Sequence, residues 1–486
     1  MVELTFYGGV NEIGGNKILP EDLDTRVFID FGMSFGRKEL FYAEFLAPRT
    51  ANGLGDFLEM GLLPDLPGIY REDLLATVGR KPEKPLCDAV LLSHAHLDHS
   101  SYISFLHERM PVHCGETSHL ILQALHEAGS RNIESELIDF KTRPILDRKK
   151  PAIKREFRTF RTGQTVRIGG LEVEPIHVDH SIPGNYGFII HTSQGAVVYT
   201  SDVRMHGTRP EMTTEFIDAA KKAKPIALIS EGTRIELNRT NESEEKVRNH
   251  CSNIAKETNK LVAADFNFKD VDRLRTFYNI AKGTQRKFAV TLGDAFLLKY
   301  LSKDPKLSVP PPDDEDIVIM IPKRGTGKYQ NEDYDKDERQ FLTLPNAWTA
   351  EKIAQNQSKL VTHTSFYSMG ELIDIYPGSV PENFRIDFSK PHSIGGPDII
   401  IPDGHTIQVK STQIYSELEV IVDPCKVGPE RKWRFCDFTY VVYYRDKDLQ
   451  VVTYILLNEL KESPRIGFGR LIRLPHEKFW KGRIEK

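Results

Sequence analysis

The run His94-Ala95-His96-Leu97-Asp98-His99 gathers four side chains that can bind a metal within six residues. It directly follows Ala89-Val90-Leu91-Leu92, a continuous apolar run that is typical of a buried strand. Burying so many ionisable groups is costly unless something binds them. Histidine nitrogen and carboxylate oxygen hold zinc or manganese while leaving a coordination position open for water. The run therefore predicts a metal site at the end of a strand.

Two other strand-like runs end just before residues of the same kind. Residues 171–176 precede His180, and residues 196–199 precede Asp202. Ligand sites in open α/β sheets tend to lie beyond the carboxyl ends of the strands. We therefore expect an α/β fold in which His180 and Asp202 join the run 94–99 at one edge.

These residues resemble the motifs of the metallo-β-lactamase superfamily. The run 94–99 matches its HxHxDH signature, and Asp30, His180 and Asp202 resemble the other motifs in their order along the chain. The resemblance implies an αββα metallo-β-lactamase fold for residues 1–205, completed by residues 356–378. It also implies that Asp30 supports the site from behind the metal ligands.

The same resemblance implies a two-metal site. One ion would take His94, His96 and His180, and the other would take Asp98 and His99, with Asp202 between them. We expect two divalent ions, Zn²⁺ with Mn²⁺ as the alternative, that share a hydroxide and stabilise the charge of a phosphoryl transition state. Asp98 and Asp202 are thus expected to be catalytic as well as metal-binding.

Residues 206–355 resemble the β-CASP domain, which marks the nucleic-acid-processing branch of the superfamily. The run 229–234 carries Glu231 as the acid of the first β-CASP motif, and we expect Glu231 to be catalytic. Residues 264–273 and the glycine-rich opening 8–16 are similar to ribonuclease J-like proteins. An alternative for Glu231 is an acidic residue at a helix N-terminus.

The sequence departs from the ribonuclease J-like pattern at residues 364–367. Thr364-Ser365-Phe366-Tyr367 stands where these enzymes have a Ser-Gly-His motif, with Phe366 and Tyr367 in place of Gly and His. His392 is the candidate for the last metal ligand of the family. The alternative is that His392 is a surface residue.

The C-terminal residues 379–486 resemble PD-(D/E)XK nucleases, which have an α/β restriction-endonuclease-like fold. Asp398 precedes a strand, and Gln408 and Lys410 share one face of the next because they are two residues apart. We expect these three residues to be catalytic at a site for Mg²⁺, or to bind nucleic acid. A β-hairpin with solvated polar residues is the alternative.

Composition limits the class of protein. The 486 residues have a net charge of −4, 28% are charged, and no apolar run approaches the ~20 residues of a membrane-spanning helix. We expect a cytoplasmic protein without membrane contact, with RNA or DNA as its partner. The sequence leaves its assembly open between a monomer and a homodimer.

The leading hypothesis is a metal-dependent nuclease that hydrolyses phosphodiester bonds, foremost in RNA. The first alternative is a DNA nuclease of restriction or defence type that uses residues 379–486. The second is a nucleic-acid-binding protein with an impaired metal site. Whether cleavage would be exonucleolytic or endonucleolytic is left open.

Overall fold

A computed structural model describes residues 2–42, 46–129, 132–143, 151–233 and 243–364, together with six strands of the C-terminal region. The chain divides into two compact units, Met1–Val380 and Pro381–Lys486, which are described separately below.

The first unit begins with two β-sheets. The first sheet runs in the order β1 (Glu3–Gly8), β2 (Lys17–Asp22), β3 (Thr25–Ile29), β4 (Ala89–Leu92), β5 (Val112–Gly115) and β8 (Phe157–Phe160). Its first three strands are antiparallel, and the pairings from β3 onward are parallel. The second sheet runs in the order β13 (Ala227–Ile229), β12 (Gly195–Tyr199), β11 (Tyr186–Thr192), β10 (Leu171–His177) and β9 (Val166–Ile168).

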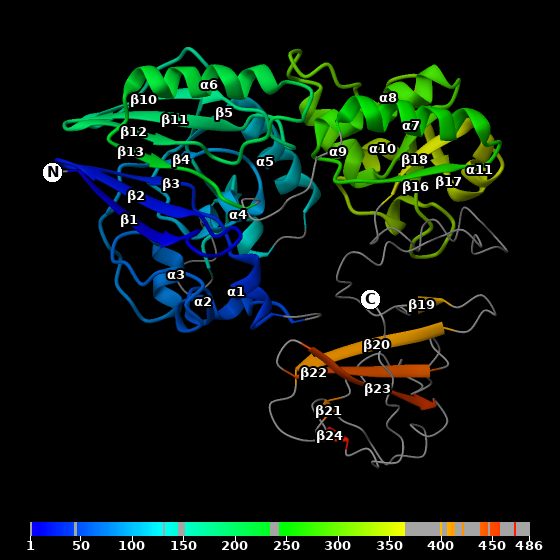
Figure 1. Cartoon of the computed structure of the whole chain (residues 1–486), viewed down its shortest axis with the longest axis horizontal. Helices are drawn as coiled ribbons and strands as arrows, with labels where there is room; N and C mark the ends of the chain where they lie inside the picture. Colours follow the sequence, from blue (N-terminus) through cyan, green and yellow to red (C-terminus); the bar gives the residue numbers. More distant parts are fainter. Residues whose placement is uncertain are drawn as a thin grey trace. The chain divides into compact units, whose positions relative to one another are not determined.

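Strand β4 shows how the layers are built. Successive side chains of a strand point to opposite faces. Leu91 accordingly joins a core shared with Val173 and Val197 of the second sheet, while Val90 packs on the helix-covered side. Helix α6 (Pro210–Ala223) covers the outer face of the second sheet (Figure 1). The order helix, sheet, sheet, helix confirms the predicted αββα metallo-β-lactamase fold.

A third sheet follows in the same unit, and all its strands are parallel. Its order is β14 (Val262–Asp265), β18 (Leu360–Thr364), β15 (Lys287–Val290), β16 (Ile317–Ile321) and β17 (Ala347–Thr349). Helices α7 (Glu244–Glu257), α8 (Val271–Gly283), α9 (Leu292–Leu301) and α11 (Ala350–Ala354) accompany it (Figure 1). This is the alternation of strands and helices predicted for the β-CASP-like region.

Two predicted domain limits differ from these pairings. Strand β13 pairs with β12, and α6 packs on β10 and β11, so the lactamase-type layers extend to about residue 229 rather than 205. Strand β18 pairs with β14 and β15 of the third sheet, whereas residues 356–378 were expected to complete the lactamase-type region. Strand β13 thus belongs with the second sheet, and β18 belongs with the third.

The two parts of this unit contact each other through α5 (Glu116–Ala128) and α9. Thr117 Oγ1 donates a hydrogen bond to Asp304 Oδ2 at 2.7 Å, and Lys299 Nζ lies 3.2 Å from Glu127 Oε2. None of the helices in the described ranges is long and apolar enough to cross a membrane.

The other described elements of the unit are short. They are α1 (Phe35–Glu39), η1 (Thr50–Asn52), α2 (Gly55–Glu59), α3 (Glu72–Thr77), α4 (Leu97–Ser100), η2 (Ser101–Phe105), η3 (Ile133–Ser135), β6 (Asp139–Phe140), β7 (Ile153–Lys154), η4 (Asn331–Asp333), α10 (Arg339–Leu342) and η5 (Gln357–Lys359).

In the second unit, only strands are described. One sheet has the order β19 (Ile399–Ile400), β20 (Thr406–Gln413), β22 (Phe438–Arg445) and β23 (Asp448–Leu456), and β21 (Val420–Ile421) pairs with β24 (Leu471–Ile472). Strands β20 and β22 are parallel, with Gln408 opposite Thr439 and Lys410 opposite Val441. His392 and Asp398 lie outside the described residues. The restriction-endonuclease-like fold of this unit stays a prediction.

Candidate metal centre

The run 94–99 leaves strand β4 and enters the short helix α4 (Leu97–Ser100). His94 and His99 are fully buried. Backbone hydrogen bonds fix α4 against the segment after β3, since Phe31 N donates to His99 O at 2.8 Å and Met33 N donates to Leu97 O at 3.2 Å. The first histidines therefore sit on the end of a buried strand, and Asp98 and His99 sit on a helix that cannot turn freely.

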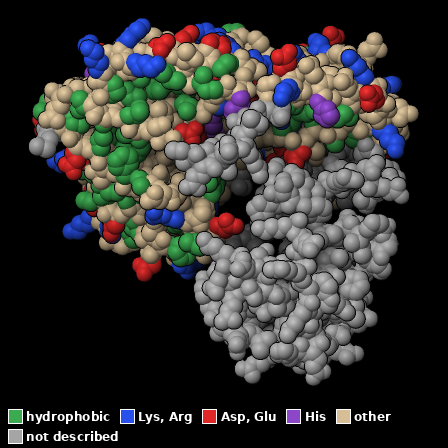
Figure 2. Space-filling model, viewed as in Figure 1, with side chains coloured by type: hydrophobic (Ala, Val, Ile, Leu, Met, Phe, Trp, Pro, Cys, Tyr) green, Lys and Arg blue, Asp and Glu red, His purple; other side chains and the backbone are tan. Residues whose placement is uncertain are grey.

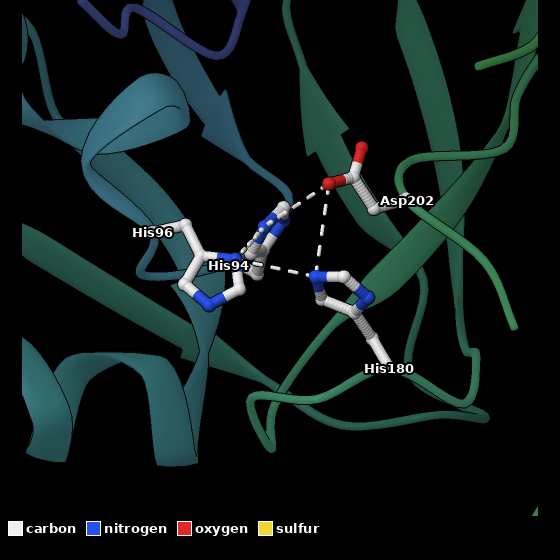
Figure 3. A group of neighbouring side chains, drawn as sticks. All are labelled: His94, His96, His180 and Asp202. Atoms are coloured by element: carbon white, nitrogen blue, oxygen red, sulfur yellow. Dashed lines mark hydrogen bonds and ion pairs between the residues drawn. The ribbon is translucent and has the colours of Figure 1, made fainter. Parts of the chain in front are cut away.

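Four donor atoms converge in a first group (Figure 3). His96 Nδ1 lies 3.0 Å from His94 Nε2 and 3.2 Å from His180 Nε2. Asp202 Oδ2 lies 3.6 Å from His180 Nε2 and 3.9 Å from His94 Nε2. His180 comes from the loop after β10, and Asp202 follows β12. Three strand ends thus meet at one point, as the sequence predicted.

A second group consists of Asp98, His99 and Asp202. His99 Nε2 lies 3.5 Å from Asp202 Oδ1 and 3.8 Å from Asp98 Oδ2. The two oxygens of Asp202 therefore face different groups, Oδ2 toward the three histidines and Oδ1 toward His99. One carboxylate in this orientation can contact two cations at once.

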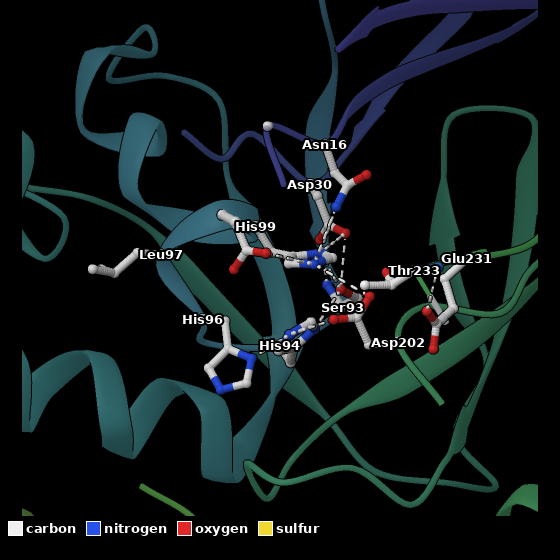
Figure 4. Close-up of polar contacts among 12 residues, drawn as sticks. Asn16, Asp30, Ser93, His94, His96, Leu97, His99, Asp202, Glu231 and Thr233 are labelled. Carbon is white, nitrogen blue, oxygen red and sulfur yellow. Dashed lines mark hydrogen bonds and ion pairs between the residues drawn. The ribbon is translucent and has the colours of Figure 1, made fainter. Parts of the chain in front are cut away.

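Asp30 holds the ring of His99 from behind. Its Oδ2 accepts hydrogen bonds from His99 Nδ1 at 2.7 Å, Tyr199 OH at 2.8 Å and Ser93 Oγ at 2.8 Å, and its Oδ1 accepts one from Ser93 N at 2.7 Å (Figure 4). Asp30 is fully buried and has a φ of 56°, a region that non-glycine residues rarely adopt. This carboxylate fixes the ring so that Nε2 points into the centre, which is how carboxylates orient metal-binding histidines.

A second chain of contacts fixes His94 and Asp202. Ser93 Oγ and Ser201 Oγ lie 3.0 and 3.3 Å from His94 Nδ1. Ser201 Oγ donates to Asn185 Oδ1 at 2.6 Å, and Asn185 Nδ2 donates to the carbonyl oxygen of Asp202 at 2.6 Å. Ser201 has a φ of 56°. The turn that presents Asp202 is therefore held by side chains from three separate segments.

The protonation of the first donor group fits a divalent cation. Burial lowers the pKa of His94, lowers that of His96 to about 3 and lowers that of His180 to about 4. These rings are thus neutral and can offer a lone pair. Burial raises the pKa of Asp202, but the hydrogen bond and the charge of His99 outweigh burial and hold this pKa at about 2. Although burial lowers the pKa of His99, Asp30 and Asp202 in turn outweigh burial and raise it. Neutral imidazoles around an anionic carboxylate form a donor set that suits transition metals.

Glu231 lies beside the centre but outside both donor groups (Figure 4). Its Oε1 accepts a hydrogen bond from Val203 N at 3.1 Å, and its Oε2 accepts one from Thr233 N at 3.3 Å. Because Val203 follows Asp202, this carboxylate fixes the Asp202 turn. Its geometry is that of a positioning residue, and the catalytic role expected from the sequence stays a prediction.

A cavity of about 740 Å³ opens beside the second donor group. Asp98, His99, Asp202 and Glu231 line it together with the glycine-rich loop 8–16. Ile13 of this loop is 67% exposed. Glu12 Oε1 accepts a hydrogen bond from Gly9 N, which holds the loop in place. The cavity is large enough for a nucleotide-sized group and reaches the metal-binding atoms.

Several supporting residues were not predicted from the sequence. They are Asn16, whose Nδ2 lies 3.1 Å from His99 Nε2, and the hydrogen-bonding residues Ser93, Asn185, Tyr199 and Ser201. Asn16 ends the glycine-rich run that was recognised, and Ser93 directly precedes His94, but single Asn, Ser and Tyr residues carry no spacing pattern.

A third group of possible metal ligands consists of Glu72, His107 and Glu108. His107 Nδ1 accepts a hydrogen bond from Arg109 N at 3.2 Å, and His107 Nε2 lies 3.3 Å from the carbonyl oxygen of Glu83. Both ring nitrogens are therefore used within the protein, and this group is structural.

Comparison with known proteins agrees with the fold and with the motifs. Residues 66–224 match the β-lactamase superfamily domain. A ribonuclease J of Helicobacter pylori strain J99 is 24% identical over 299 residues, which cover 60% of this chain and 36% of that protein. A ribonuclease J of Pyrococcus abyssi is 26% identical over 242 residues, which cover 48% of this chain and 46% of that protein. The chain thus spans less than half of the length of these relatives.

A crystal structure of a protein of unknown function from Enterococcus faecalis V583 is similar over 75% of this chain and 77% of its own. The TM-score is 0.55 and the sequence identity is 21%, so the likeness concerns the fold. The metallo-β-lactamase fold implies divalent metal ions, and the two donor groups described above are the residues of this chain that fit them.

Proposed function

We propose that the chain is a metal-dependent nuclease that hydrolyses phosphodiester bonds, foremost in RNA, since residues 66–224 match the β-lactamase superfamily domain. One observation carries the proposal. Asp202 turns one oxygen toward His94 and His180 and the other toward His99, so that a single carboxylate joins two donor groups.

We assign the two donor groups to two divalent ions. His94, His96 and His180 would hold one, Asp98 and His99 would hold the other, and Asp202 would contact both. A mixture of imidazole and carboxylate donors favours Zn²⁺ or Mn²⁺ over Ca²⁺, which takes oxygen ligands. When bound, such ions activate water for attack and stabilise the negative charge of a phosphoryl transition state.

The residues of the chain supply position and charge. Asp98 and Asp202 reduce the repulsion between two nearby dications, and Asp30 keeps the His99 ring in its orientation. Glu231 holds the turn that carries Asp202 through its contact with Val203. The cavity beside these residues would receive the nucleotide next to the scissile phosphate.

RNA is favoured as the substrate by two features. The matched relatives are named ribonuclease J, and the parallel third sheet has no counterpart in the αββα layers alone. A small hydrolase of the superfamily would not require such an additional α/β layer.

Incubation of the full chain with end-labelled single-stranded RNA and DNA tests the proposal. Parallel reactions contain Mn²⁺, Zn²⁺, Mg²⁺ or EDTA. We expect RNA cleavage with Mn²⁺ or Zn²⁺ and none with EDTA. Cleavage of neither polymer would contradict the proposal and favour a binding protein. Mg²⁺-dependent DNA cleavage that survives His94→Ala would instead assign the activity to residues 379–486.

A further inference from the structure

A second and smaller cavity lies on another side of the loop that carries His180. Its volume is about 70 Å³, whereas one water needs about 10–15 Å³ of such space, so a group the size of a phosphate fits. The lining residues used below are His177, Asp179, His180, Asp272, Arg209, Arg275 and Lys306, and we name this cavity the basic pocket.

Each of the two acidic residues of the basic pocket, Asp179 and Asp272, is paired with an arginine. Asp179 Oδ1 lies 3.1 Å from Arg204 Nε, and Asp272 accepts hydrogen bonds from Arg204, Thr208 and Arg275. Arg204 does not line the basic pocket, but its positive charge compensates the negative charge of one of the two carboxylates. Arg204 and Arg275 together balance Asp179 and Asp272.

Two cations then remain at the mouth of the basic pocket. Lys306 is exposed, and no described carboxylate lies within ion-pair distance of its Nζ. Arg209 Nε lies 2.7 Å from Glu211, but both side chains are more than half exposed, and such surface pairs are weak. The basic pocket therefore has an uncompensated positive charge.

His177 also lines the basic pocket. Burial, together with the nearby Arg209 and Arg161, lowers the pKa of His177 to about 4. The side chain is thus neutral and does not change the charge of the basic pocket.

The large cavity beside the second donor group differs sharply. Among the described residues that line it there is no Lys or Arg, while Glu12, Asp98, Asp202 and Glu231 contribute carboxylates. On the face drawn in Figure 2, Lys and Arg side chains are interspersed with Asp and Glu side chains. A nucleic acid is a polyanion, so its binding requires basic residues near the centre that the large cavity does not supply.

We propose that the basic pocket binds a backbone phosphate of the single-stranded nucleic acid next to the scissile bond, through Lys306 and Arg209. His180 belongs both to this pocket and to the first donor group, so the bound phosphate lies one side chain away from the metal-binding atoms. The inference rests on the proposed function and adds a binding site for the phosphate next to the scissile bond.

The test uses the full chain and a fluorescein-labelled single-stranded RNA of about twelve nucleotides. Binding is followed by anisotropy in Mn²⁺ between 50 and 200 mM salt, with Asp98→Asn present in every variant to slow cleavage. Lys306→Gln and Arg209→Gln are compared with Lys222→Gln, an exposed lysine in the last turn of α6. Each loss of a phosphate contact should raise Kd by roughly three- to tenfold and reduce the salt slope by about 0.7.

Steady-state cleavage by the corresponding variants with Asp98 intact gives a second readout. We expect KM to rise in Lys306→Gln and Arg209→Gln with kcat nearly unchanged, and both constants to stay at the parent value in Lys222→Gln. If the parent cleaves RNA but all three variants bind and cleave like the parent, the basic pocket is overturned and the proposed function stands. If the parent neither binds nor cleaves RNA, both proposals fail.

Discussion

Asp98 is the residue that contributes a carboxylate to the second donor group alone. Its Oδ2 lies 3.8 Å from His99 Nε2, and its side chain is 17% exposed. Asp98→Asn keeps the shape of the side chain but removes its charge, which weakens the second cation and the chemistry that depends on it. We expect kcat for RNA cleavage to fall by roughly a thousandfold, which corresponds to about 4 kcal/mol. A rate near that of the parent protein would show that hydrolysis occurs elsewhere in the chain.

Asp30 offers a test of the support behind the ligands. Four hydrogen bonds from His99, Tyr199 and Ser93 reach its two oxygens. In Asp30→Asn, the NH2 group would replace one of these oxygens and face groups that are themselves hydrogen-bond donors. Metal affinity should fall by roughly 10- to 100-fold, as for other residues that orient metal-binding histidines. Calorimetric titration with Mn²⁺ measures this, and an unchanged affinity would mean that His99 is held by other contacts.

At this scale, the sequence predicted the ligand candidates well, because four of them stand within six residues and the others follow strand ends. The structure brings all six together, and their role as metal ligands stays a prediction. Tyr199 could not be predicted, since its hydroxyl meets Asp30 across 169 residues of chain. A single Tyr at the end of a strand is equally compatible with simple packing.

At the scale of elements, the backbone of Gly32 packs directly against helix α4. A Cβ atom at Gly32 would lie 1.7 Å from Asp98 O and 2.3 Å from His99 N, both of which are backbone atoms. Gly32→Ala must therefore displace α4, and we expect it to lower the free energy of unfolding by roughly 3 kcal/mol and to reduce metal binding. Gly36→Ala is the matched control, because nothing lies within 4 Å of the added atom. Equal stability of the two variants in urea would contradict the tight packing of α4.

Arg204 links the loop of His180 to helix α8. It contacts Asp179, which precedes His180, and Asp272 in the first turn of α8, and all three side chains are no more than 10% exposed. Arg204→Met would leave two buried carboxylates without their main partner, at a cost of about 3–5 kcal/mol. Chemical denaturation measures the loss. A change below about 1 kcal/mol would mean that Thr208 and Arg275 suffice.

The positions of strands were predicted more successfully than their partners. The run 89–92 is strand β4 as expected, and the runs at 171–176 and 196–199 are β10 and β12. Strand β13 lies within residues 206–355, which were expected to belong to the β-CASP-like domain, but it joins the second sheet rather than the third. Local apolar patterns specify that a strand forms, whereas the choice of neighbour depends on contacts that are distant in sequence.

At the scale of the whole molecule, Pro381–Lys486 form a second unit in addition to the one that holds the candidate metal centre. Strands β20 and β22 are parallel, and Gln408 and Lys410 both lie in β20. Gln408 stands where a carboxylate would favour a hard cation, so we predict that this unit binds nucleic acid. Lys410→Ala in the full chain should weaken binding of plasmid DNA in Mg²⁺, as measured by gel shift. Binding equal to that of the parent would remove Lys410 from any nucleic-acid site.

The most direct test of the whole account is metal content measured together with RNA cleavage on the same preparations. The parent, His94→Ala, His96→Ala and His180→Ala proteins are purified, dialysed against chelator-treated buffer and examined by elemental analysis. The account predicts zinc or manganese in the parent, a clear loss in each variant, and RNA cleavage that falls with it. Equal metal content in the parent and in all three variants, or cleavage that persists without the metal, would contradict a metal-dependent centre at this site.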